Sequence, residues 1–120
     1  MDANRKKELK RQYKMTKPRM GVFVIRSRTS DKCHVQAAKD LRADINGAKM
    51  RLSGGFHPCL ELQKEASELG ADNFSIEILD ELAYSPDESK TDYTEELEIL
   101  RSMWEEKLSK DNLVFYKKRL

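Results

Sequence analysis

Two histidines and two cysteines carry the most versatile chemistry in this 120-residue chain, and they lie in two short motifs, Cys33-His34 and His57-Pro58-Cys59. An imidazole titrates near neutral pH and is the commonest general base, so His34 could accept a proton from a reacting group. Cysteine and histidine also bind zinc, but neighbouring residues on a strand point to opposite faces, and the spacing matches no familiar zinc pattern. We interpret His34 first as a structural residue that is hydrogen-bonded at a sheet edge, and we keep a catalytic His34 as the alternative.

Basic side chains form the second group with functional chemistry. Lysine and arginine neutralise phosphate groups and give non-specific, salt-sensitive affinity for nucleic acid. Lys39, Arg42 and Lys49 share one face of a predicted helix, which favours binding over a merely solvated face. We therefore predict a surface that binds DNA or RNA, formed by Arg26, Arg28, Lys39, Arg42, Lys49 and Arg51.

Charge is distributed unevenly along the chain, although the net charge is only +2. Residues 1–19 hold eight lysines and arginines against two acidic residues, which gives +6, whereas residues 80–106 hold ten acidic residues against two basic ones, which gives −8. A basic arm and an acidic block indicate a nucleic-acid-facing end and a different face elsewhere. The alternative is that the two blocks pair with each other or are simply solvated.

The hydrophobic pattern predicts the elements that position these residues. Apolar residues alternate, or recur every three to four positions, in segments separated by turn residues, which is typical of an α+β protein. The first strand is apolar on both faces, with Phe23 among its residues, and is therefore predicted to be central. The predicted elements are strands at 20–28, 33–36 and 74–79, and helices at 2–14, 38–52, 58–69 and 94–108.

This order of elements predicts one domain at residues 20–120, preceded by a basic arm at residues 1–19. Its fold class is α+β, with a small, three-stranded, mainly antiparallel sheet flanked by helices in the order β-β-α-α-β-α. The helices at 38–52 and 94–108 are expected to pack on the sheet through Leu41, Ile45, Leu100 and Trp104.

The sequence also bears on location. It contains no apolar run as long as a membrane helix and no apolar signal core near its N-terminus. Two cysteines without such a signal are typical of reduced thiols. We therefore expect a cytoplasmic protein without a membrane partner, and the sequence leaves its oligomeric state open.

Three short motifs open the predicted domain: Gly21-Val22-Phe23, His34-Val35-Gln36 and Ala38-Lys39-Asp40-Leu41. A glycine and an aromatic residue on one strand, then a second short strand leading into a basic helix, resemble the opening of the GIY-YIG nuclease domain. Later motifs are similar to the second half of small proteins of that family, so the resemblance covers about residues 20–108 and implies the family's fold. These later motifs are His57-Pro58, Leu62-Gln63, Leu69-Gly70, and residues 74–79 and 104–108.

The resemblance implies an active site of two tyrosines, an arginine on the first helix and a glutamate on the last helix. In the family, a tyrosine, or a water that it activates, starts the attack on phosphorus, the arginine steadies the phosphate, and the glutamate holds a divalent metal ion. In this sequence Phe23 and His34 stand at the positions of the two tyrosines, and Gln36 stands at that of the glycine that follows the second tyrosine. Asp44 stands at the position of the arginine, and Arg101 at that of the glutamate.

Each of these changes has a physical consequence. Phe23 packs like tyrosine but cannot exchange a proton, and Asp44 repels phosphate. A divalent cation ~6 Å from the Arg101 guanidinium would be repelled by roughly 5 kcal/mol at an effective dielectric constant of ~20. We therefore expect a non-catalytic or catalytically impaired protein, without a cofactor, that binds nucleic acid or has a regulatory role. Because Asp44 and Arg101 reverse the family's charges, we also predict that they form a salt bridge across the former cleft.

Two alternatives remain open. If the last helix is registered one turn differently, Glu98 takes the place of the family's glutamate. The protein would then be a divergent, metal-dependent DNA endonuclease with His34 as its base and Mg²⁺ bound to Glu98. In the other alternative, the acidic segment 80–106 makes the protein a protein-interaction module.

Overall fold

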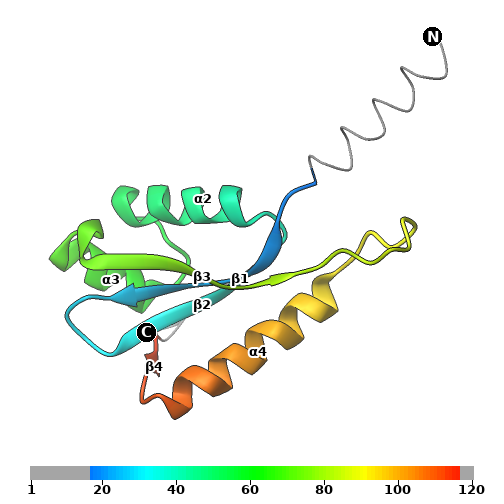
Figure 1. The fold of residues 1–120 in the computed structure, drawn as a ribbon. Helices are drawn as coiled ribbons and strands as arrows, with labels where there is room; N and C mark the ends of the chain where they lie inside the picture. Colours follow the sequence, from blue (N-terminus) through cyan, green and yellow to red (C-terminus); the bar gives the residue numbers. More distant parts are fainter. Residues whose placement is uncertain (1–16, 117–120) are drawn as a thin grey trace, which may run out of the picture.

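The fold is given by a computed structural model, which describes residues 17–116 (Figure 1). The predicted α+β class and the order of the main elements are confirmed, whereas the helix predicted at 2–14 lies outside the described residues. The elements are β1 (Met20–Ser27), β2 (Lys32–Ala38), α2 (Leu41–Gly54), α3 (Leu60–Leu69), the short 3₁₀ helix η1 (Ala71–Asn73), β3 (Phe74–Leu82), α4 (Thr94–Lys110) and β4 (Val114–Phe115).

Strand β1 is the centre of the sheet, as predicted. The strand order is β3-β1-β2-β4, and β1 pairs antiparallel with both β2 and β3. Successive side chains of a strand point to opposite faces, and both faces of β1 are apolar, so each face needs a cover. Phe23 and Ile25 pack with α2 and α3, and Val22 and Val24 pack with the α4 side (Figure 1). The sheet is therefore the middle layer of three.

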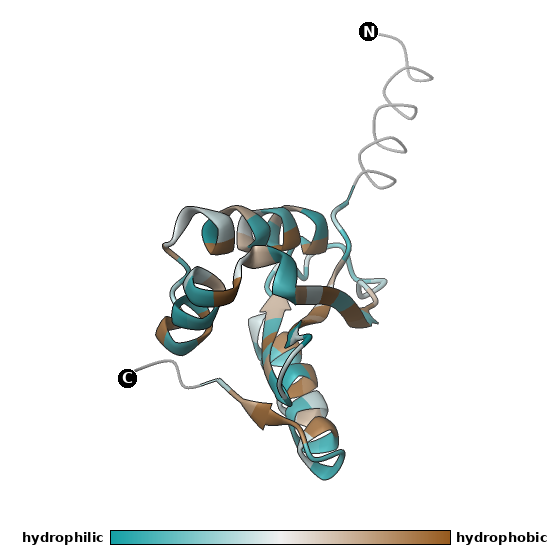
Figure 2. Ribbon diagram, turned by 90° about the vertical axis from the view of Figure 1, so that its left-hand side faces the viewer, coloured by the Kyte–Doolittle hydropathy of each residue, from teal (hydrophilic) through white to brown (hydrophobic). Residues whose placement is uncertain are grey.

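The sheet has four strands rather than the predicted three. The fourth, β4, runs parallel to β2 and pairs with Lys32 and Cys33. It has only two residues, so it carries no alternation that sequence analysis can detect. Figure 2 shows this short apolar strand in brown near the end of α4. Phe115 packs into the α4 side of the sheet, and the next residue, Tyr116, packs into the opposite core.

Helix α2 begins three residues later than predicted, because Ala38 still belongs to β2, where it pairs with Gly21. Asp40 caps the helix, and its side chain accepts a hydrogen bond from the Ala43 N–H at 3.1 Å. Gly55 ends it in the left-handed conformation, with φ at 84°. These two local signals fix where the basic side chains of α2 lie.

Helix α4 packs on the sheet through Leu97, Leu100 and Leu108. Trp104 was expected in this core but is half-buried. Its indole N–H donates to Asp80 of β3 at 3.2 Å, so the ring is drawn to the sheet edge. Within residues 17–116, neither α4 nor any other helix is long and apolar enough to cross a membrane.

We predict that Gly21 is required for the close pairing of β1 with β3. A β-carbon at this position would overlap the Asp80 carbonyl oxygen and lie 2.9 Å from Glu81 Cα. Gly21→Ala should lower the free energy of unfolding by about 1–3 kcal/mol in urea titrations. Gly47→Ala is the matched control, because its β-carbon would meet nothing within 4 Å, and it should stabilise helix α2 by about 0.5–1 kcal/mol. Equal effects of the two substitutions would contradict this account.

Candidate functional site

His34 and His57 meet on the face of the sheet that α2 and α3 cover. His34 lies opposite Ile25, so its side chain shares the face of Ile25, whereas Cys33 packs on the α4 side. His57 lies between α2 and α3, and its ring centroid is 5.5 Å from that of His34, with the rings nearly perpendicular. His34 is half-buried and His57 is 4% exposed. The two motifs of the sequence are thus joined in one site.

A buried hydrogen-bond network fixes His57. Its Nδ1 accepts a hydrogen bond from the Cys59 N–H at 3.0 Å, so the neutral ring carries its proton on Nε2. The His57 N–H donates to Gln63 Oε1 at 2.7 Å, and Gln63 Nε2 donates to the Leu52 carbonyl at 3.1 Å. The network ties the end of α2 to the start of α3. Sequence analysis missed it, although a glutamine next to Leu62 on the buried face of a helix is the signal for it.

Charge around the histidine pair comes from α2. Burial lowers the pKa of His57, and the nearby positive charge of Arg51 lowers it further. Burial raises the pKa of Asp44, repulsion from Asp40 raises it too, and Arg51 acts in the opposite sense. The site therefore combines a buried neutral imidazole with the half-buried imidazole of His34 and a nearby guanidinium.

The predicted salt bridge between Asp44 and Arg101 is wrong. Helix α2, which carries Asp44, and helix α4, which carries Arg101, cover opposite faces of the sheet (Figure 1). Arg101 is held within its own helix instead, with Nη2 at 2.6 Å from Glu98 and Nη1 paired with Glu105. These are the i,i+3 and i,i+4 pairs that a helix places side by side. The anionic partners that Arg101 requires are therefore local ones.

Glu98, the magnesium ligand of the endonuclease alternative, is engaged by Arg101. Its carboxylate accepts hydrogen bonds from Arg101 Nε at 3.1 Å and Nη2 at 2.6 Å. Glu98 lies on α4, which covers the face of the sheet opposite to the one that Ile25 and His34 share. No three His, Cys, Asp or Glu side chains among residues 17–116 form a group that could hold a metal ion. In this arrangement the surroundings of Glu98 do not fit a magnesium site.

The six predicted phosphate-binding residues are spread over the domain. Arg26 alternates with Ile25 along β1 and so lies on the α4 side. Lys39 precedes α2 and is close enough to Asp92 to lower the pKa of that carboxyl group. Arg42 is exposed in the first turn of α2, and Arg51 lies in its last turn beside the histidine pair. These four do not form one surface.

The other two, Arg28 and Lys49, line a common groove of about 730 Å³. It runs between the second half of α2 and the start of β3, and Ser53 contributes to the same wall as Lys49. Asp72 and Glu77 also line it, so the groove carries both signs of charge. We call it the α2–β3 groove.

Ion pairing divides the basic residues into two classes. Within the described part of the chain, none of the six predicted phosphate-binding residues has a carboxylate within ion-pair distance. The cations that do form ion pairs there are Arg19, Lys32, Lys90, Arg101 and Lys110. The six predicted residues therefore form no ion pair within residues 17–116, although Lys39 and Arg51 act at longer range on Asp92 and Asp44.

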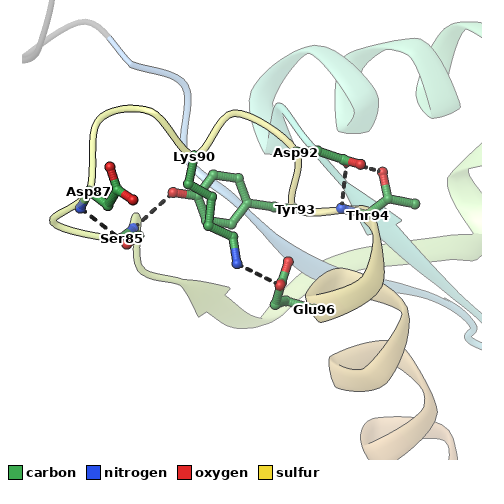
Figure 3. Close-up of polar contacts among 7 residues, drawn as sticks. All are labelled: Ser85, Asp87, Lys90, Asp92, Tyr93, Thr94 and Glu96. Carbon is green, nitrogen blue, oxygen red and sulfur yellow. Dashed lines mark hydrogen bonds and ion pairs between the residues drawn. The ribbon is translucent and has the colours of Figure 1, made fainter.

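The acidic segment 80–106 uses several of its carboxylates to hold its own loop (Figure 3). Asp92 accepts hydrogen bonds from the Thr94 N–H at 3.0 Å and the Thr94 hydroxyl at 2.7 Å, and Lys90 pairs with Glu96 at 2.7 Å. These hydrogen bonds lower the pKa of both Asp92 and Glu96. Part of the acidic charge is thus engaged inside the loop and at the start of α4.

Comparison with solved structures identifies the fold. The catalytic domain of the homing endonuclease I-TevI superposes with a TM-score of 0.64, covering 82% of this chain and 96% of that domain at 21% sequence identity. A mutant of the same catalytic domain gives a TM-score of 0.61, covering 76% of this chain and 84% of that one at 22% identity. No family model and no curated protein matches the sequence. The resemblance drawn from the motifs is confirmed for the fold, which is GIY-YIG-like.

We predict that His57 makes the domain less stable in mild acid. Its folded-state pKa is below the usual value near 6.5, so the unfolded chain binds the proton more tightly. The free energy of unfolding should therefore fall as the pH is lowered through about 6.5. Urea titrations above and below this pH measure the loss. His57→Asn keeps an oxygen that can accept from the Cys59 N–H and should flatten the dependence, whereas His34→Asn should leave it in place. A His57→Asn variant with the wild-type slope would contradict the assignment.

Proposed function

We propose that this chain, whose fold is that of a GIY-YIG nuclease catalytic domain, binds nucleic acid and does not cleave it by the family's chemistry. The similar structures are those of an endonuclease, which makes nucleic acid the first candidate for a partner. The proposal depends on the side chains of this chain, because fold alone does not fix function.

The observation that carries the proposal is the set of cations without an ion pair that lie on or just after β1 and on or just before α2. Phosphate affinity needs lysine and arginine whose charge is not already neutralised within the protein. The six residues named above meet this condition within residues 17–116, whereas Arg101 and Lys90 do not. Arg28 and Lys49 additionally share the α2–β3 groove, where one bound strand can contact both. We expect these two to contribute most to affinity.

The absence of cleavage is argued from two positions. Phe23 has no hydroxyl group, and its side chain is fully buried between the sheet and the helices. In the sequence, Arg101 corresponds to the family's metal-binding glutamate, and its guanidinium pairs with Glu98 and Glu105. Loss of a general base costs on the order of 10²- to 10⁴-fold in rate.

A second candidate is a divergent nuclease that uses His34 as its base. The observation in its favour is the contact between His34 and His57, because a neutral, positioned imidazole beside another is suited to proton transfer. The nearby Arg51 would supply the positive charge that a phosphate requires. The third candidate, a protein-interaction module built on residues 80–106, predicts no affinity for nucleic acid.

We predict salt-dependent binding of labelled oligonucleotides, measured by fluorescence anisotropy at several salt concentrations. The Arg28→Ala, Lys49→Ala double variant should bind on the order of 10-fold more weakly, and its plot of log affinity against log salt should be shallower by about 1–2. Lys64→Ala, Lys110→Ala removes the same charge from α3 and α4 and serves as the matched control. Equal losses in the two double variants would mean that only net charge matters. No binding at low salt would overturn the proposed function.

We also predict that the purified protein leaves plasmid and single-stranded DNA intact in the presence of Mg²⁺ or Mn²⁺. The physical reason is that the groups for attack and for metal binding are missing at Phe23 and Arg101. Gel electrophoresis after prolonged incubation checks this. Cleavage that is lost in both His34→Ala and Glu98→Ala would establish the endonuclease alternative, and cleavage that persists in both would indicate a contaminating enzyme.

A further inference from the structure

We infer that the α2–β3 groove and the exposed Phe56 beside it form a binding site for single-stranded nucleic acid, with Phe56 stacking on a base. This inference rests on the proposed function and specifies its ligand. A site for single strands combines cations that follow the phosphates with an aromatic ring on which a base stacks. Both parts are present next to one another on the outer side of α2.

Phe56 is an aromatic ring presented to solvent in a fixed position. It is 63% exposed, although phenylalanine normally lies in the core. Its backbone N–H donates to the Arg51 carbonyl at 3.0 Å, which anchors the residue to the last turn of α2. The ring packs against Gly54, where a β-carbon would lie only 2.9 Å from Phe56 Cδ1. Glycine at position 54 thus allows the ring to lie on the helix backbone.

The ring is continuous with the α2–β3 groove. Lys49 and Ser53 line the groove and also border the shallow apolar surface formed by Met50, Gly54 and Phe56. A strand that crosses Lys49 therefore meets Phe56 on one side and the groove on the other. Neither Lys49 nor Arg28 is engaged in an ion pair within residues 17–116, so both can contact phosphates.

The shape and charge of this surface favour a single strand over other ligands. The surface around Phe56 is shallow. It therefore suits a flat nucleobase that stacks on the phenyl ring better than an apolar side chain that needs a deep pocket. Asp72 and Glu77 line the groove together with Arg28, so a bound strand must place its phosphates at Lys49 and Arg28 and away from these two carboxylates. A duplex would bring two backbones and would keep its bases stacked inside, away from Phe56. A single strand can place its phosphates at Lys49 and turn a base to the ring.

Two substitutions test the role of the ring without touching the cations. Phe56→Ala removes the ring, and Gly54→Ala displaces it by means of the added β-carbon. Gly54 is within helix α2 and does not need a left-handed conformation, so alanine there should not disturb folding. Leu69→Ala is the control, because Leu69 is an exposed apolar residue, 53% accessible, on α3. Urea titration of each variant verifies that it is folded.

Anisotropy is measured with three probes of the same length, about 16 nucleotides: an oligothymidylate, its duplex with oligoadenylate, and a strand of abasic nucleotides. We expect the oligothymidylate to bind more tightly than the duplex. Phe56→Ala and Gly54→Ala should weaken oligothymidylate binding by about 5- to 150-fold, whereas binding of the abasic strand, which has phosphates but no bases, should change less than about 2-fold. Leu69→Ala should bind all three probes like the wild type. A fourth probe, an oligouridylate of the same length, compares the affinity for RNA with that for DNA.

The outcomes separate this inference from the proposed function. If the Arg28→Ala, Lys49→Ala variant is impaired but Phe56→Ala and Gly54→Ala bind oligothymidylate like the wild type, the stacking site is wrong and nucleic-acid binding stands. If the duplex binds as tightly as the single strand in every variant, the preference for single strands is wrong. If no probe binds to the wild type, both the inference and the proposed function fail.

Discussion

The burial of β1 on both of its faces is the constraint on which the rest of this structure depends. Met20 to Ile25 are all buried, and none of them offers a polar side chain to solvent. Such a strand needs a neighbour on each side and a layer of helix above and below. The partner strands β2 and β3, the pair α2 and α3, and helix α4 meet these needs. Any functional site must therefore lie on the outer surface of a helix, at a sheet edge, or where a loop enters between layers.

This constraint explains the two kinds of site that the domain offers. The histidine pair lies where the segment between α2 and α3 enters beside β2, and its polar groups are satisfied by the backbone around them. The cations of α2 lie on the solvent side and remain unpaired within the described residues. One region fixes the fold, and the other is the one that the proposed nucleic-acid partner would contact.

Much of the fold could be predicted from the sequence, because it depends on local patterns. The continuous apolar run of β1, the alternation in β3, the recurrence of apolar residues in α2, and the glycines at 54 and 55 can be recognised without tertiary information. The relation between Asp44 and Arg101 was not readable in this way, since it depends on which face of the sheet each helix covers. Arg101 found its partners three and four residues away, which a helical pattern does show. Strand β4 was missed because two residues have no period.

The candidate site, like the fold, could be predicted only in part from the sequence. The types of its residues could be identified from the sequence, but their grouping could not. His34 and His57 are far apart in the chain, and their contact results from the packing of the segment after α2 on β2. Arg28 and Lys49 likewise come together only because η1 and β3 return beside α2. The link between Gln63, His57 and the end of α2 is a matter of buried hydrogen bonds, which no spacing rule describes.

The short strand β4 has a consequence for the kinetics of folding. Its two residues pair with Lys32 and Cys33, which lie about 80 residues earlier in the chain. The next residue, Tyr116, reaches the core beneath α3, where its hydroxyl group donates a hydrogen bond to Glu65. Helices and the β1–β2 hairpin can form within microseconds, but this contact must close a loop that includes nearly the whole domain. Contacts of such high sequence separation slow the folding of small proteins. We therefore expect the smallest strand of the sheet to pair last during folding.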